Sequence, residues 1–183
     1  MIHFLKPFTR AVLGLAILGL AACETTDVPV TPNPPDASPT VQVNGVRLVT
    51  VVPSQRGLFV ANNAATAQRV NAQDGATISN KDASLEVVPG SIPDDVTITM
   101  KAENDGYVSF KFGPNGLQFD PAAVLTISAD KANLDGIDPS QLAIAGAHDD
   151  VDDWQVVGGA YDAAANSVSV EIQHFSRYAL CVR

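Results

Sequence analysis

The sequence predicts an all-β domain, a β-sandwich or barrel, over residues 41–183, behind a signal segment (1–22) and a proline-rich tether (23–40). After residue 41, short apolar runs alternate with polar residues at the period of a strand. Turn-forming Gly, Pro, Asn and Asp interrupt these runs about every ten residues, as in sandwiches and barrels. No long stretch carries the apolar period of a helix.

The N-terminus reads as a bacterial secretion signal. Lys6 and Arg10 precede an apolar stretch from Ala11 to Leu20, and small residues follow before Cys23. A positive start, an apolar core and small residues at the cut are the parts of a secretory signal. The apolar run is shorter than the roughly 20 residues of a membrane-spanning helix. This favours a cleaved signal over a transmembrane anchor.

The run Leu20-Ala21-Ala22-Cys23 resembles the lipobox of bacterial lipoproteins. The resemblance implies that diacylglycerol is joined to the Cys23 thiol, that residues 1–22 are removed and that Cys23 becomes the first mature residue. Glu24 stands where an Asp tends to retain enterobacterial lipoproteins at the inner membrane. The resemblance therefore implies an outer-membrane address, with the domain facing the periplasm or the cell surface. The acyl lipid is the only attached group that we expect, with no cofactor.

Net charge and cysteine content restrict the classes of partner and the disulfides that this chain can form. Two of the 11 basic residues lie in the signal and none of the 20 acidic ones does, so residues 23–183 carry nine against 20, a formal charge of −11. Such a chain repels nucleic acid and an anionic membrane surface, so the lipid would do the anchoring. With Cys23 lipidated, Cys181 is left alone. We expect a buried, inert thiol, the alternative being a disulfide with a partner.

The segment Glu24–Thr40 is rich in proline, which disfavours both helix and sheet. It is typical of an extended tether, and its 17 residues would reach about 50 Å at roughly 3.1 Å each. Strands are predicted where apolar and polar residues alternate: 46–50, 85–88, 96–100, 108–112 and 168–172. The Ala-rich stretch 61–72 is predicted as one short helix. Aromatic filling between the sheets is expected from Phe110, Phe112, Phe119, Trp154, Phe175 and Tyr178.

Three segments resemble ZU-five domains, a family named for zonula occludens proteins, netrin receptors and ankyrins. They are SLEVVPGSIPDDVTITM (84–100), FGPNGLQFDPAAVLTI (112–127) and VEIQHFSRYAL (170–180). Ala122 and Ala123 depart from the family's pattern after the proline of the second segment. The resemblance covers residues from about 75 to 182 and implies an antiparallel β-sandwich that binds partner proteins. Residues 41–73 have no counterpart, and we expect them to add a hairpin.

The tripeptide His174-Phe175-Ser176 resembles the self-cleavage sequence of some ZU-five domains. The Ser176 hydroxyl would attack the Phe175 carbonyl, His174 would take its proton as general base, and water would hydrolyse the ester. The reaction needs a strained peptide at Phe175–Ser176, because the amide must leave planarity. The alternative is a closing strand in which Phe175 is a core residue.

The acidic run His148–Asp153 holds four carboxylates, Asp149, Asp150, Asp152 and Asp153, which could bind Ca²⁺. It lacks the glycine and terminal glutamate of an EF-hand, so a solvated turn is the alternative. Neither His148 nor His174 has the spacing of a zinc site, and no serine lies in a GxSxG motif.

Together these patterns predict a lipid-anchored envelope protein without enzymatic activity, a structural or protein-interaction module whose partner is unknown. The first alternative is a module that cleaves itself once at Phe175–Ser176. The second is a Ca²⁺- or carbohydrate-binding lipoprotein, for which Trp154 is the only tryptophan.

Overall fold

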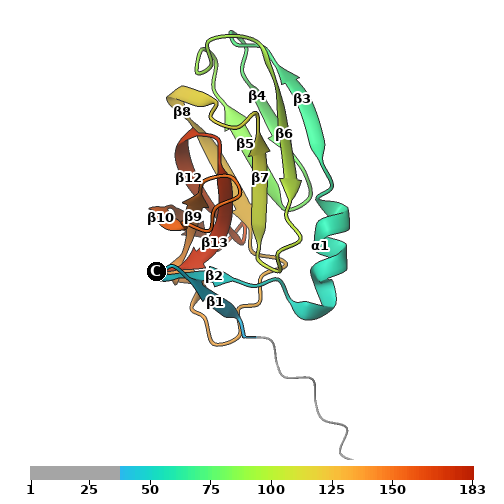
Figure 1. Cartoon of the computed structure of the whole chain (residues 1–183), viewed down its shortest axis with the longest axis vertical. Helices are drawn as coiled ribbons and strands as arrows, with labels where there is room; N and C mark the ends of the chain where they lie inside the picture. The colour runs from blue at the N-terminus through green and yellow to red at the C-terminus, as the bar shows by residue number, and fades with distance from the viewer. Residues whose placement is uncertain (1–37) are drawn as a thin grey trace, which may run out of the picture. The chain divides into compact units, whose positions relative to one another are not determined.

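The computed structural model describes residues 38–183, which form two antiparallel sheets packed face to face (Figure 1). The predicted all-β sandwich is therefore confirmed. The predicted signal, Cys23 and all but the end of the predicted tether lie outside the described residues. Among residues 38–183, no helix is long and apolar enough to cross a membrane.

The first sheet has eight strands. Its central strand is β13 (Arg177–Val182). One edge of β13 pairs along its whole length with β9 (Leu142–Ala147), which in turn pairs with the edge strand β10 (Gln155–Gly158). The other edge pairs first with β7 (Ser109–Gly113) and then with β2 (Val46–Val49). The sheet continues from β7 to β6 (Val96–Ala102) and β3 (Thr66–Val70), and from β2 to β1 (Thr40–Val43).

The second sheet has five strands in the order β11 (Ala160–Asp162), β12 (Ser167–His174), β8 (Gln118–Ser128), β5 (Ala83–Val87) and β4 (Ala76–Ser79). The pairing of β12 with β8 runs from Ser167↔Ser128 to Ile172↔Ala123, and after a bulge resumes at His174↔Gln118. The edge strand β11 is short and pairs only with Ser167–Ser169. The other half of β12 therefore has a neighbour on one side only within the described chain.

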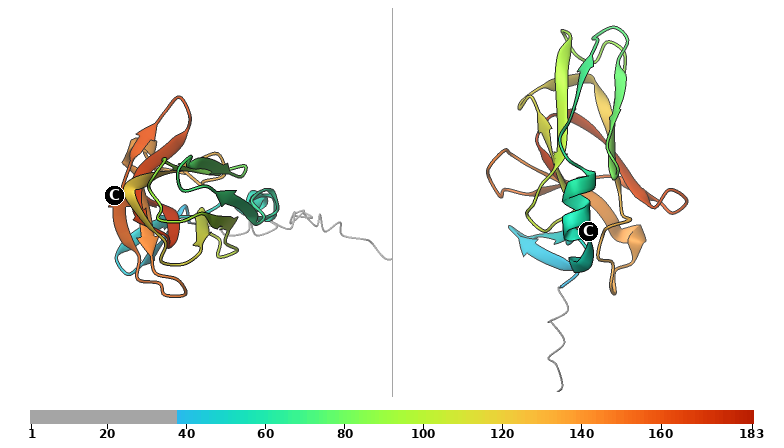
Figure 2. Two further views of the ribbon diagram at one scale, coloured as in Figure 1. Left: turned by 90° about the horizontal axis from the view of Figure 1, so that it is seen from above. Right: turned by 90° about the vertical axis from the view of Figure 1, so that its right-hand side faces the viewer.

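The five predicted strands are present as β2, β5, β6, β7 and β12. The helix predicted over 61–72 is wrong. The helix α1 (Arg56–Asn62) lies mostly before that stretch, after a short 3₁₀ turn (Pro53–Gln55), and Thr66–Val70 forms β3 (Figures 1 and 2). The register of β3 with β6 runs from Thr66↔Met100 to Val70↔Val96 and buries Val70. Sheet pairing and this burial outweigh the helical propensity of the alanines.

The opening region begins with a hairpin, β1–β2. Its turn residues, Asn44 and Gly45, have φ of 49° and 85°, as a two-residue type I′ turn requires. The hairpin joins the first sheet through β2, where Leu48 pairs with Cys181.

The core between the sheets is rich in aromatic rings. Phe175 lies at its centre, with its ring 5.5 Å from that of Phe112 and 4.9 Å from that of Phe119. Phe112 also contacts Tyr178, and Phe59 of α1 contacts Phe110, each edge to face. Five of the six predicted core aromatics therefore fill the space between the sheets.

Trp154 is the exception, and its predicted place between the sheets is wrong. It is buried on the outer face of the first sheet, in a second cluster with Ala143, Ala145, Ala147, Ala179, Cys181, Val46 and Leu48. Because the strand residues beneath it are mostly alanine, this face has room for the indole. The loop 148–154 thus crosses the outer face and places a large side chain on it.

Gly75 occupies a position that other residues fill at a cost. Its φ is +65°, and a Cβ there would lie 2.2 Å from the carbonyl oxygen of Val87. Gly136 has a similar φ of +68° with nothing near its Cβ position. We expect Gly136→Ala to lower the free energy of unfolding by about 1–2 kcal/mol for the left-handed backbone. Gly75→Ala should lower the free energy of unfolding clearly more, because the backbone around Val87 must move to make room for the methyl group. Equal losses of the two variants in urea unfolding would contradict this packing.

Candidate functional site

The chain turns a corner between β12 and β13, and this corner holds the residues predicted for self-cleavage. Phe175 is buried and its N–H donates to the carbonyl of Leu117 at 2.9 Å. The Ser176 carbonyl accepts from the N–H of Phe112 at 3.3 Å. None of the corner residues 174–177 has a positive φ. The corner is anchored on both sides of the Phe175–Ser176 bond.

Ser176 and His174 come together in sequence but not in a catalytic hydrogen bond. Ser176 is buried, and its hydroxyl donates to the carbonyl of Ala147. The imidazole of His174 is exposed, and its Nδ1 lies 3.3 Å from the Phe175 carbonyl oxygen. No hydrogen bond joins the two side chains in the described chain. The main effect of Ser176→Ala should therefore be the loss of the hydrogen bond that joins the corner to β9.

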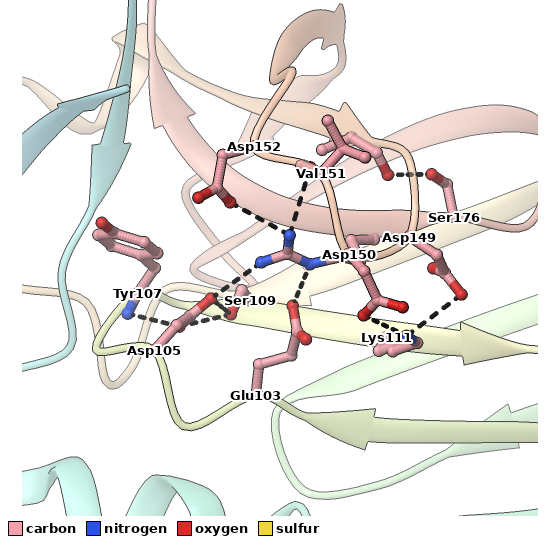
Figure 3. A network of polar contacts seen from close by, with 12 residues as sticks. Glu103, Asp105, Tyr107, Ser109, Lys111, Asp149, Asp150, Val151, Asp152 and Ser176 are labelled. Atoms are coloured by element: carbon pink, nitrogen blue, oxygen red, sulfur yellow. Dashed lines mark hydrogen bonds and ion pairs between the residues drawn. The ribbon is translucent and has the colours of Figure 1, made fainter. Parts of the chain in front are cut away.

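The next residue, Arg177, is the centre of a polar network that the sequence motifs did not predict. Figure 3 labels its partners Glu103, Asp105 and Asp152. Its Nε donates to Glu103 at 2.6 Å, its Nη1 to Asp152 at 3.2 Å, and its Nη2 lies 3.6 Å from Asp105. Nη1 also lies 3.4 Å from the carbonyl oxygen of Val151. Arg177 is only 8% exposed, and its guanidinium carbon lies 5.0 Å from the ring centre of Trp154. A buried cation here neutralises carboxylates from two separate loops.

The acidic run is divided among several partners. Asp149 and Asp150 flank the Lys111 ammonium at 3.2 and 3.3 Å, and Asp152 binds Arg177. Asp153 accepts from the His148 ring, Nδ1 to Oδ2, at 2.6 Å and from its backbone N–H, and these bonds lower the pKa of Asp153. No three carboxylate, imidazole or thiol groups among residues 38–183 are arranged to hold a metal ion. The loop is therefore organised by cationic side chains of this chain.

The loop 148–154 is tied to strands of the first sheet, and Figure 3 shows Asp149 and Asp150 beside Lys111. Its carboxylates reach down to Lys111 of β7 and to Arg177 of β13. The carbonyl of Asp152 also accepts from the side-chain amide of Asn44 in the β1–β2 turn. The loop is held over the outer face of the first sheet with Trp154 beneath it. Since the indole is only 2% exposed, it offers no open platform for a sugar.

A pocket of about 400 Å³ lies on the side of the sandwich where β10 and β12 approach each other. Its apolar wall comes from Ala122, Gly146, Val157, Ile172 and Tyr178, and its polar wall from His148, Asp153, Gln155, Glu171, Gln173, His174 and Ser176. The pocket exists because β11 pairs with only the first part of β12, so nothing in the second sheet covers the inner face of β10. His148 and His174, the two histidines among residues 38–183, both line this pocket.

Cys181 lies in the outer-face cluster and is fully buried. Burial raises the pKa of its thiol to about 11, with Arg183 acting in the opposite direction. At about pH 8 the folded chain should therefore resist iodoacetamide, because the thiolate is the reactive form. We expect no mass increase at Cys181 until the chain is unfolded in urea. Rapid alkylation of the folded chain would contradict the burial.

The sequence motifs predict the corner and the acidic loop as sites, but not the contacts that join them. A charged residue at the start of an otherwise apolar strand, Arg177 before Tyr178–Val182, was the signal for a buried ion pair. The pocket has no sequence signal, because it results from the length of β11. The predicted lipidation site, Cys23, lies outside the described residues.

A scan against protein-family models gives no match to this chain, and a search of curated proteins gives no significant relative. The resemblance to ZU-five domains therefore stays a prediction.

Proposed function

We propose that this chain is a lipid-anchored module of the bacterial envelope, without enzymatic activity, whose β-sandwich binds a partner protein. The lipobox-like run ending at Cys23 supports the anchor, and the proline-rich segment after it supports a tether. The charge of −11 over residues 23–183 favours a protein partner over nucleic acid or an anionic surface.

One observation carries the choice of a binding module: of the side chains predicted for catalysis or metal binding, Ser176 and the four aspartates are used to hold the fold. Ser176 bonds the carbonyl of Ala147, and the carboxylates of the acidic loop bind Lys111, Arg177 and His148. Self-cleavage is the alternative function, and it requires the Ser176 hydroxyl to leave Ala147 and meet an unplanar Phe175–Ser176 amide. Calcium binding would require the loop to release its cations.

The proposal is tested by photo-cross-linking in living cells. A photoreactive residue is placed at exposed apolar positions spread over the surface: Val41, Leu58, Val151 and Val156. We expect at least one position to yield a discrete product that contains a second protein, confirmed by a reciprocal cross-link from that protein. Leu58 on α1 and Val156 on β10 lie on different elements, so the yield should differ between them. Absence of any product from all four positions would contradict a binding role.

A further inference from the structure

The second sheet has an open edge next to the pocket. β11 pairs with Ser167–Ser169, and no other described strand pairs with that edge of β12 beyond Ser169. The stretch without a strand on this edge, Val170–His174, spans about 17 Å at roughly 3.3 Å per residue. Its last carbonyl, that of His174, accepts from the Tyr178 hydroxyl at 2.6 Å. Unpaired strand edges of this kind accept an extended peptide as a further strand.

The inner face of β10 lies opposite this open edge and is apolar. Val157 lines the pocket and is 47% exposed, although Ile172 and Tyr178 beside it are almost fully buried. Gly146 keeps the pocket open, since a Cβ there would lie 3.1 Å from a ring carbon of Tyr178. A strand added beside Val170–His174 would place alternate side chains against Val157, Ile172 and Tyr178. These side chains would have to be apolar.

The remaining side chains of an added strand would face outward, next to Glu171. Glu171, Val124 and Glu86 are cross-strand neighbours, so they share the outer face of the second sheet. The Glu171 carboxylate has no hydrogen bond or ion pair within residues 38–183, and those residues carry nine basic against 17 acidic side chains, a charge of −8. A basic side chain opposite Glu171 complements this charge.

We propose that the pocket and the open edge of β12 together form a docking site for an extended segment of a partner protein that alternates apolar with basic residues. The proposal rests on the binding role proposed above and names its site and the chemistry of the partner. Backbone pairing with Val170–His174 would supply affinity, while the pocket and Glu171 would select the side chains.

The test is a library of acetylated hexapeptide amides in which every position is varied, screened against the processed chain as purified from its cells. We expect the selected peptides to alternate apolar residues with Lys or Arg. Val157→Asp should weaken their binding at least about tenfold, because it places a carboxylate on the apolar wall. Val156→Asp is the matched control, on the same strand with 48% exposure but outside the pocket lining, and should leave binding unchanged.

A second matched pair tests the charge. Glu171→Gln should weaken the Lys- and Arg-containing peptides by up to about fivefold, the effect of one cross-strand ion pair. Glu86→Gln removes the same charge from the same face of the sheet and should have no effect. Failure to select any peptide, or equal effects of Val156→Asp and Val157→Asp, would overturn the site.

Two other occupants would also overturn the proposal. If residues 24–36 of this chain fill the pocket, their deletion will shift the methyl resonances of Val157 and Ile172. If a second copy fills it, Val157→Asp will convert a dimer to a monomer in sedimentation. Cross-links from positions away from β10 that persist in Val157→Asp would leave the binding role standing and remove only this site.

Discussion

Replacing Arg177 with methionine should lower the free energy of unfolding by about 3–5 kcal/mol. Methionine keeps much of the volume of the side chain but removes the cation from a site where it is 8% exposed and contacts Glu103, Asp105 and Asp152. Glu103 and Asp105, whose side chains are 19% and 22% exposed, are then left without their partner, which is the costly way to break a buried ion pair. Urea unfolding, followed by far-UV circular dichroism, measures the loss.

The matched control is Arg69→Met, which breaks an ion pair with Asp95 at 3.4 Å whose side chains are 69% and 39% exposed. Exposed pairs contribute about 0–1 kcal/mol, so the control should be nearly silent. Adding Glu103→Gln to Arg177→Met should recover part of the loss, because it removes one of the uncompensated charges. Equal losses in Arg177→Met and Arg69→Met would show that the network does not hold the loop.

Replacing Cys23 with alanine should move the protein from the membrane fraction to the soluble fraction of the cell. Residues 38–183 contain no helix that could span a membrane, and the acidic chain is repelled by anionic lipid. Attachment would then depend on acyl chains, at about 0.8 kcal/mol for each CH₂ that enters the bilayer. Fractionation followed by immunoblotting gives the readout.

Cys181→Ala serves as the control, since it removes the other cysteine of the chain without touching the predicted lipid site. It should stay in the membrane fraction, with at most a loss of stability from the outer-face cluster. If Cys23→Ala fractionates with membranes as the parent does, the lipid is not the anchor.

The strands were predictable because their pattern is local. Val96–Met100 and Val168–Ile172 alternate in the period of a half-buried strand, and both are strands in the structure. The helix predicted over 61–72 failed because β3 is decided by its pairing with β6, a partner 26 to 34 residues away along the chain. Local alanine content carries no information about that partner.

The site was less predictable, for a similar reason. His174, Ser176 and the four aspartates were visible as motifs, but their partners, Ala147, Lys111 and Arg177, depend on which strands become neighbours. Trp154 was expected between the sheets because it is large and apolar, yet the alanines of β9 and β13 receive it on the opposite face. The pocket depends on β11 being three residues long, a property of the assembled sheet.

An intact mass of the mature protein, purified from its membranes and measured under denaturing conditions beside Ser176→Ala, tests the central claim most directly. A lipid-anchored binding module predicts one species that begins at Cys23, carries the mass of its acyl lipid and runs to Arg183 in both proteins. An N-terminus without lipid would contradict the anchor. A species ending at Phe175 in the parent but absent from Ser176→Ala would replace the binding module with a self-cleaving one.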